Sequence, residues 1–160
     1  MTEKEFNEIK GIALDANLTG IEKLRKILMA TIISSKQGAV DNSVPAFQKK
    51  PQLLALHMRD TLGIAPELIS YVIEEGMKDG TIRAIQPLEL SQMIMLFFNI
   101  WVNPWIYAWK PNELRNIFLF IEGILENIGI PVFTEEMFCA IEELYSGYER
   151  KYATRNHTTR

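Results

Sequence analysis

Between its glycines and prolines, the chain carries apolar residues every three or four positions, which is the period of an amphipathic α-helix. The segment 3–17, for example, aligns Phe6, Ile9, Ala13 and Ala16 on one face. No segment alternates apolar and polar residues between hairpin signals, as a half-buried strand would. The sequence therefore predicts an all-α fold, a single helical domain of about six to seven helices.

Residues that typically begin or end helices divide this pattern into elements. Thr19 and Glu22 form a T-x-x-E capping box, in which the two residues satisfy backbone groups at a helix start. A proline stands near the start of several other segments, and a glycine follows where the apolar pattern stops. The predicted helices occupy residues 3–17, 19–36, 51–63, 66–80, 87–110, 111–129 and 134–148.

The segment 87–110 is apolar around most of its circumference, so we expect both of its sides to be covered. Pro104 crowds the carbonyl one turn earlier, which predicts a kink or break near Asn103. The run Leu90–Trp109 has no charged side chain over about the length that spans a bilayer. Its amide side chains would be costly to leave unpaired in lipid, and we therefore expect no membrane span.

Three tryptophans, Trp101, Trp105 and Trp109, follow one another at helical spacing within the same segment. Aromatic rings of this kind dominate cores and oligomer interfaces by buried area. They are also typical of a mostly apolar ligand pocket, in which Asn99 or Asn103 would supply the orienting polar group. The sequence leaves both interpretations open, a filled core and a lined cavity.

The segment 111–129 carries a coiled-coil-like repeat of aliphatic residues. With the preceding helix it would form an antiparallel hairpin whose outer face stays apolar. A two-fold partner presenting the same hairpin would bury both faces in a four-helix bundle, although packing within one subunit also favours such a repeat. The predicted interface residues are Leu114, Ile117, Ile121, Ile124 and Ile128.

Charge and cysteine content narrow the choice of partners and compartment. The net charge of −3 gives no basic stripe for phosphates, so the chain is a poor nucleic-acid binder by itself. The only cysteine, Cys139, cannot form an internal disulfide, and the first residues lack an apolar signal region. We expect a cytoplasmic protein whose residues 151–160 form a polar flexible tail.

The chain contains no phosphate-binding glycine loop, paired metal cysteines or nucleophile elbow. His57 and Asp60 are three residues apart on one predicted helix, as a base and its orienting group would be. Nothing in the sequence supplies a nucleophile or a second metal ligand, and a structural or pocket-lining histidine is the simpler interpretation. We therefore expect no enzyme activity, no catalytic residue, no metal site and no cofactor.

Two stretches carry a resemblance to a known family. Glu67–Trp101 resembles the helix, the E-x-G-x-x-x-G-x-[IL]-R turn and the following dimer helix in the C-terminal domain of TetR-family transcriptional regulators. Gly20–Ile33 is similar to a pocket helix of that domain, and the order of elements agrees from Glu3 to Gly129. The resemblance implies an effector cavity, a dimer made by residues 87–110 and 112–129, and an effector-driven shift of residues 3–17. The family's N-terminal helix-turn-helix is absent here, so DNA binding is expected only through such a head.

These observations lead to two hypotheses. The first is that residues 1–150 form the homodimeric effector-binding and dimerisation domain of a TetR-like repressor, which senses an apolar small molecule. The alternative is a structural helical interaction protein without a ligand. For the first hypothesis the predicted ligand-binding residues are Met58, Leu62, Tyr71, Asn99, Trp101 and Trp105.

Overall fold

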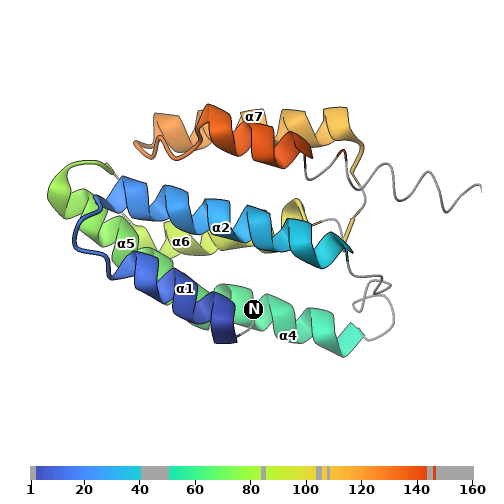
Figure 1. The fold of residues 1–160 in the computed structure, drawn as a ribbon, viewed down its shortest axis with the longest axis horizontal. Coiled ribbons are helices and arrows are strands. Elements are labelled where there is room, and N and C mark those ends of the chain that lie inside the picture. Colours follow the sequence, from blue (N-terminus) through green and yellow to red (C-terminus); the bar gives the residue numbers. More distant parts are fainter. Residues whose placement is uncertain are drawn as a thin grey trace, which may run out of the picture.

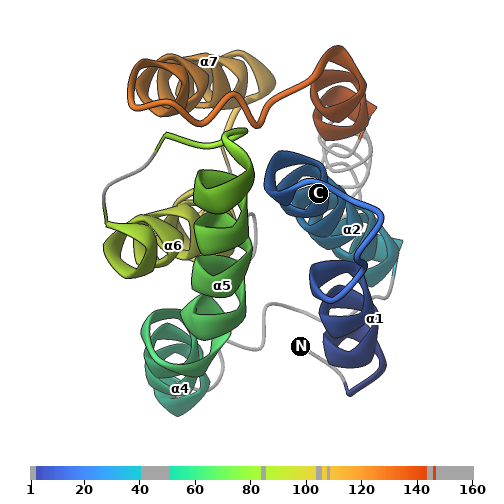
Figure 2. The same ribbon diagram turned by 90° about the vertical axis from the view of Figure 1, so that its left-hand side faces the viewer.

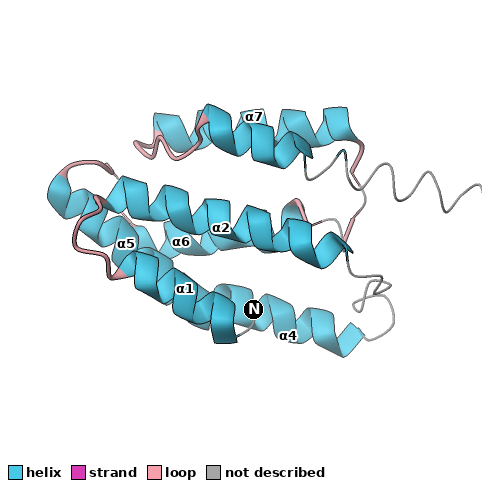
Figure 3. Ribbon diagram, viewed as in Figure 1, coloured by secondary structure: helices cyan, strands magenta, loops and turns pink. Residues whose placement is uncertain are grey.

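The computed structural model describes residues 3–40, 51–83, 86–103, 106–107, 109–143 and 146, and these residues form helices joined by loops, with no strand among them (Figure 3). The predicted all-α class is confirmed. Residues 135–143 are also helical. The named elements are α1 (Glu3–Ala13), α2 (Gly20–Val40), α4 (Pro51–Leu62), α5 (Ile64–Asp79), α6 (Pro87–Leu96), the π-helix η1 (Phe97–Trp101) and α7 (Pro111–Asn127).

Helix α5 is the central element, because it packs against α1, α2, α4 and α6. Helices α1 and α4 lie on one side of the molecule, and α7 lies on the opposite side (Figures 1 and 2). The helix at 135–143 lies on the same side as α7 (Figure 2). Helices α2, α5, α6 and α7 thus each bury an apolar stripe between these layers, as amphipathic helices require.

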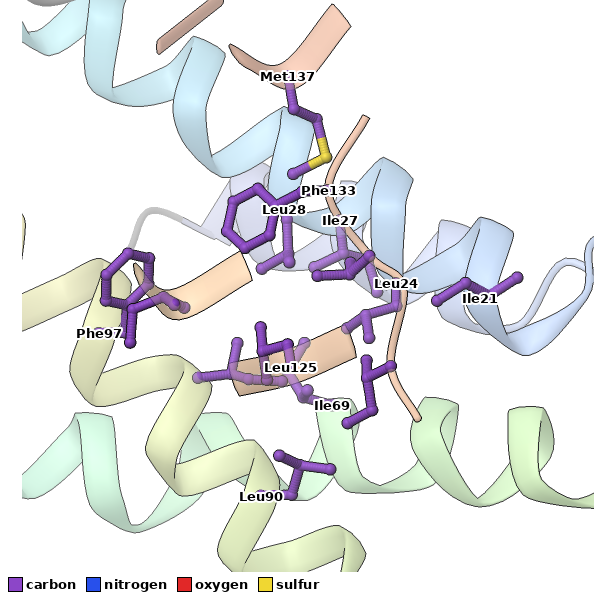
Figure 4. Close-up of a cluster of buried hydrophobic side chains, with 14 of the residues drawn as sticks. Ile21, Leu24, Ile27, Leu28, Ile69, Leu90, Phe97, Leu125, Phe133 and Met137 are labelled. Carbon is purple, nitrogen blue, oxygen red and sulfur yellow. The ribbon is translucent and has the colours of Figure 1, made fainter. Parts of the chain in front are cut away.

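Apolar side chains from both halves of the chain meet in one core (Figure 4). Fully burying a leucine, isoleucine or phenylalanine side chain contributes about 1.5–3 kcal/mol. The core therefore holds together segments that are far apart in the sequence. Its largest fully buried side chains are Leu24, Ile27, Ile73, Ile82, Ile94, Leu114, Phe118, Leu125, Ile130 and Met137.

Several predicted boundaries are confirmed, and others differ. Helices α4 and α7 begin at Pro51 and Pro111, and α5 ends at Gly80, which adopts a left-handed φ of 80°. Helix α1 ends four residues before the predicted residue 17, and α2 continues four residues past the predicted residue 36. Helix α5 begins at Ile64, two residues before Pro66. A proline is tolerated in this first turn because the N–H that it lacks would have no partner inside the helix.

The helix predicted for 87–110, with a break near Asn103, is α-helical over only part of that length. The α-helical part, α6, ends at Leu96, and η1 continues it with a wider turn to Trp101. The N–H of Val102 then donates to the Phe97 carbonyl at 3.0 Å, five residues back instead of four. The helical run thus ends at Trp101, close to the break that Pro104 predicted near Asn103, and a π-turn precedes that end.

Candidate functional site

Two glycines make a close contact between α2 and α5. A Cβ atom added to Gly20, at the start of α2, would lie 2.2 Å from the Cα atom of Gly76 in α5. A side chain at that position would force the helices apart, since real Cβ atoms essentially never come this close. The two glycines therefore set the distance between α2 and α5.

The end of α5 caps the start of α2. The Gly20 N–H donates to the Asp79 carboxylate at 2.7 Å, and the Ile21 N–H donates to the Thr81 hydroxyl oxygen at 3.2 Å. These are among the N–H groups that have no partner inside a helix, and a carboxylate there also meets the positive end of the helix dipole. The Thr81 hydroxyl and the Gly20 N–H, both donating to Asp79, hold the pKa of its carboxyl below its ordinary value.

One charged group is buried at this contact. Lys23 is only 4% exposed, and its ammonium group forms an ion pair with the Glu75 carboxylate, which also accepts a hydrogen bond of 2.7 Å from the Tyr71 hydroxyl. The lysine and then the tyrosine hold the pKa of the Glu75 carboxyl below its ordinary value, and the same carboxylate raises the pKa of Tyr71. A buried lysine needs such a partner, because an isolated ammonium group in the core would be costly. Sequence reasoning missed this pair, because the residues around Lys23 in α2 do not indicate that its position is buried.

We call this contact the α2–α5 joint (Gly20, Lys23, Glu75, Gly76 and Asp79). The turn after α5 links it to a third helix, α7. The Ile82 N–H donates to the Gly76 carbonyl at 2.9 Å, and the buried Ile82 side chain covers Gly76. The Arg83 N–H then donates at 3.0 Å to the carbonyl of Gly129, just past the end of α7. In the E-x-G-x-x-x-G-x-[IL]-R pattern, Gly76, Ile82 and Arg83 thus make contacts at this turn, and Gly80 supplies its left-handed conformation.

The predicted ligand residues that the structure describes lie on three helices, α4, α5 and η1. Tyr71 belongs to the α2–α5 joint through Glu75. Met58 and Leu62 are exposed residues of α4, and Asn99 and Trp101 lie in η1. Trp105 lies outside the described residues.

Helix α4 has an apolar surface that the rest of the chain leaves uncovered. Thr61 is the only buried residue in it, although it packs against α5 and α6. Two polar contacts hold it there: the Gln92 side chain donates to the Leu62 carbonyl at 3.0 Å, and His57 Nε2 lies 3.1 Å from the Asn99 carbonyl oxygen. The exposed apolar residues of α4 are Leu53, Leu56, Met58 and Leu62.

His57 thus has a structural partner in η1. Because a carbonyl oxygen only accepts hydrogen bonds, the Nε2 atom of His57 must carry the proton and donate it. The other member of the pair considered from the sequence, Asp60, is exposed on α4. Among the described residues, no group of three or more histidine, cysteine, aspartate or glutamate side chains is placed to hold a metal ion.

The aromatic residues of 97–109 divide between core and surface. Phe97 is buried, and its ring makes edge contacts with Phe98, Trp101 and Phe118, the last at a centroid distance of 5.2 Å. Trp101 is 40% exposed, and its backbone carbonyl accepts a hydrogen bond of 2.7 Å from the Trp109 indole N–H. Phe97 therefore fills the core, whereas Trp101 lies at the surface.

Helix α7 carries two apolar stripes. The inner stripe (Leu114, Phe118, Ile121 and Leu125) is buried in the chain's own core. The outer stripe (Ile117, Phe120, Ile124 and Ile128) is half-buried or exposed, with Phe120 at 58%. Of the five residues predicted for a dimer interface, two therefore belong to the inner stripe and three to the outer one. Phe120, on the outer stripe, was not among them.

The outer stripe is continuous with η1. The rings of Phe120 and Trp101 meet edge to face at a centroid distance of 6.5 Å. Nearby on α7, a Cβ atom added to Gly123 would meet nothing within 4 Å, so the surface there is open. An apolar surface of this kind, with room for another backbone, is suited to contact with a second helix.

Comparisons with protein families, with curated proteins and with solved structures found no match to this chain. Within the part of the chain that the structure describes, no helix combines the length and the apolar character that crossing a bilayer requires.

Proposed function

We propose that this chain is a homodimeric sensing domain of a TetR-like transcriptional regulator, which binds an apolar small molecule. The observation that carries the proposal is the outer stripe of α7, because large apolar side chains stand exposed there beside the open position at Gly123. A second copy of the chain would cover this stripe in a two-fold arrangement with α6, η1 and α7.

The proposed effector site lies on the side of the molecule opposite to α7. Helix α4 exposes four apolar side chains and is attached to its neighbours partly through the His57 and Gln92 hydrogen bonds. A small apolar molecule lodged against α4 would cover these side chains, with polar groups nearby to orient it. The proposed role is binding without catalysis, in the cytoplasm, and any DNA contact belongs to a helix-turn-helix head.

The alternative, a structural interaction protein without a ligand, is favoured by a different observation. Phe97, Phe118 and Phe133 are buried in contact with other aromatic rings, so part of the aromatic content is used in packing. In that case the outer stripe would still bind a partner helix, while α4 would respond to no small molecule.

Native mass spectrometry of the purified protein, without detergent, tests both proposals in one spectrum. We expect a particle of twice the 18.4 kDa chain mass that carries a small-molecule adduct, which solvent extraction and accurate mass would identify. A dimer without an adduct, unchanged by a panel of apolar probe compounds, would favour the structural alternative. A monomer at micromolar concentration would refute the homodimer.

Ile121→Asp is not a suitable interface variant, although the sequence suggests it. Ile121 is only 6% exposed in the single chain, so a charge there would unfold the subunit whether or not it dimerises. Variants of the outer stripe avoid this difficulty because their side chains are not part of the core.

A further inference from the structure

Helix η1 contacts both α4, with its exposed apolar surface, and the outer stripe of α7. On one side, His57 of α4 donates to the Asn99 carbonyl at 3.1 Å. On the other side, the ring of Trp101 packs against Phe120 of the outer stripe, at 6.5 Å between centroids. Five residues of π-helix thus touch both α4 and the exposed face of α7.

The Asn99 carbonyl is held by side chains. Carbonyl groups near a helix end have no partner inside the helix and need another donor. The Asn103 side-chain amide donates to this carbonyl at 2.9 Å, in addition to His57. The donor from α4 therefore stabilises the end of η1 in its present form.

The π-turn has a close alternative. In η1 the Val102 N–H donates to the Phe97 carbonyl, and in an α-helix it would donate to the carbonyl of the next residue, Phe98. In the α-helical form, the segment 97–101 would close a tighter turn of 3.6 residues, so the side chains along it would point in different directions. Trp101, the last residue of η1, would then turn relative to Phe120. Isolated π-turns of this kind are frequent at functional sites.

We propose that η1 couples the position of α4 to the outer stripe of α7. The hydrogen bond from His57 to the Asn99 carbonyl connects α4 to η1, and the contact of Trp101 with Phe120 connects η1 to α7. A displacement of α4 removes the His57 donor, favours the α-helical alternative, and turns Trp101 away from Phe120. That an effector causes the displacement rests on the proposed function, whereas the coupling itself does not.

The first test replaces the donor on α4 in the 160-residue chain. His57→Leu removes the N–H and keeps an apolar side chain, whereas His57→Gln keeps an N–H donor. In protein labelled with 5-fluorotryptophan, we expect His57→Leu to shift the Trp101 fluorine resonance, assigned through Trp101→Phe. Amide exchange at Val102 should become about fivefold faster, as expected for the loss of one hydrogen bond. His57→Gln should preserve most of the native values.

The second test works from the other end, because coupling between two sites is reciprocal. Phe120→Ala should shift the His57 ring resonances, which are readily assigned because the chain has only two histidines. Leu119→Ala is the matched control: it also shortens an exposed apolar residue of α7, next to Phe120. We expect the control to leave the His57 resonances in place. Phe120 is exposed, so this arm does not depend on a core substitution.

Either arm can overturn the proposal. An unchanged Trp101 resonance and unchanged Val102 exchange in a folded His57→Leu variant would do so, as would equal effects of His57→Leu and His57→Gln. If His57→Leu does not fold, the reciprocal arm decides, and equal shifts with Phe120→Ala and Leu119→Ala, or none, would refute the coupling. Because both arms use protein without added effector, they can fail while the sensing proposal stands, and the converse also holds.

Discussion

Single atoms decide how closely α2 and α5 approach. Gly20 and Gly76 leave no room for a Cβ atom at the first position, where it would lie 2.2 Å from the Gly76 Cα atom. The hydrogen bond from the Gly20 N–H to Asp79 depends on the same approach, at 2.7 Å. The loss of one glycine would therefore disturb packing and capping together.

We predict that Gly20→Ala lowers the free energy of unfolding by about 1–3 kcal/mol, the usual range for a core contact that becomes overpacked. Urea denaturation monitored by circular dichroism would measure the change. Gly11→Ala is the control, because a Cβ atom there would meet nothing within 4 Å. An equal effect of the two substitutions would show that the close approach contributes nothing to stability.

Residues of this kind also mark the limit of prediction from sequence. Gly20 and Gly76 are 56 positions apart, and nothing local says that they touch. The burial of Lys23 was equally unpredictable, because it depends on Glu75, which belongs to another helix. Only the resemblance of the segments around these glycines to a known family suggested that they matter.

At the scale of whole elements, local chemistry predicted most helix boundaries. The Glu22 carboxylate accepts hydrogen bonds from the N–H and the hydroxyl of Thr19, as the T-x-x-E pattern indicated. Pro111 and Gly80 mark an observed start and an observed end. These signals were readable because they act within one turn of the chain.

The sequence could not place η1 or the two stripes of α7. The run before Pro104 is apolar on nearly all sides, so its periodicity does not reveal a wider turn at Phe97–Trp101. On α7, the aliphatic repeat spans both stripes. Phe118 determines which stripe is buried, because its ring packs against Phe97 of η1. Tertiary contacts, which no local pattern records, thus determine which face of α7 remains exposed.

The joint between α2 and α5 should make stability depend on pH. Hydrogen bonds hold the pKa of Asp79 below its ordinary value of 3.8, and those from Lys23 and Tyr71 do the same for Glu75 below 4.5. A carboxyl whose pKa is lower in the folded state stabilises the fold above its unfolded pKa, and this contribution disappears as the pH falls through the folded value. The unfolding free energy of the native chain should therefore fall between about pH 5 and pH 3.

We predict that Asp79→Asn is less stable than the native chain at neutral pH, and that the difference shrinks on acidification. Urea denaturation at a series of pH values from about 7 to about 3 would measure it. Asp60→Asn, which removes an exposed carboxylate of α4, controls for the change in net charge. A difference between the native chain and Asp79→Asn that stays constant down to the lowest pH would contradict the prediction.

At the scale of the whole molecule, the question is what covers the outer stripe of α7. Phe120 is 58% exposed and Ile128 is 44% exposed, while the inner stripe of the same helix is buried. Gly123 follows Phe120 by one helical turn, and the space around it is open in the single chain. A leucine there would fit the isolated chain and would collide with a partner helix packed on the stripe.

We predict that Gly123→Leu leaves the folded chain intact and raises the dissociation constant of the proposed homodimer about 10- to 100-fold, which corresponds to an overpacked contact of about 1–3 kcal/mol. Because leucine has the higher helix propensity, the monomer itself should become slightly more stable. Sedimentation velocity over a dilution series would give the dissociation constant. Gly11→Leu makes the same chemical change on α1, where a Cβ atom also meets nothing within 4 Å, and it should leave the dimer unaffected. If both variants dimerise like the native chain, a second copy does not cover the outer stripe, and the dimer, if present, uses another face.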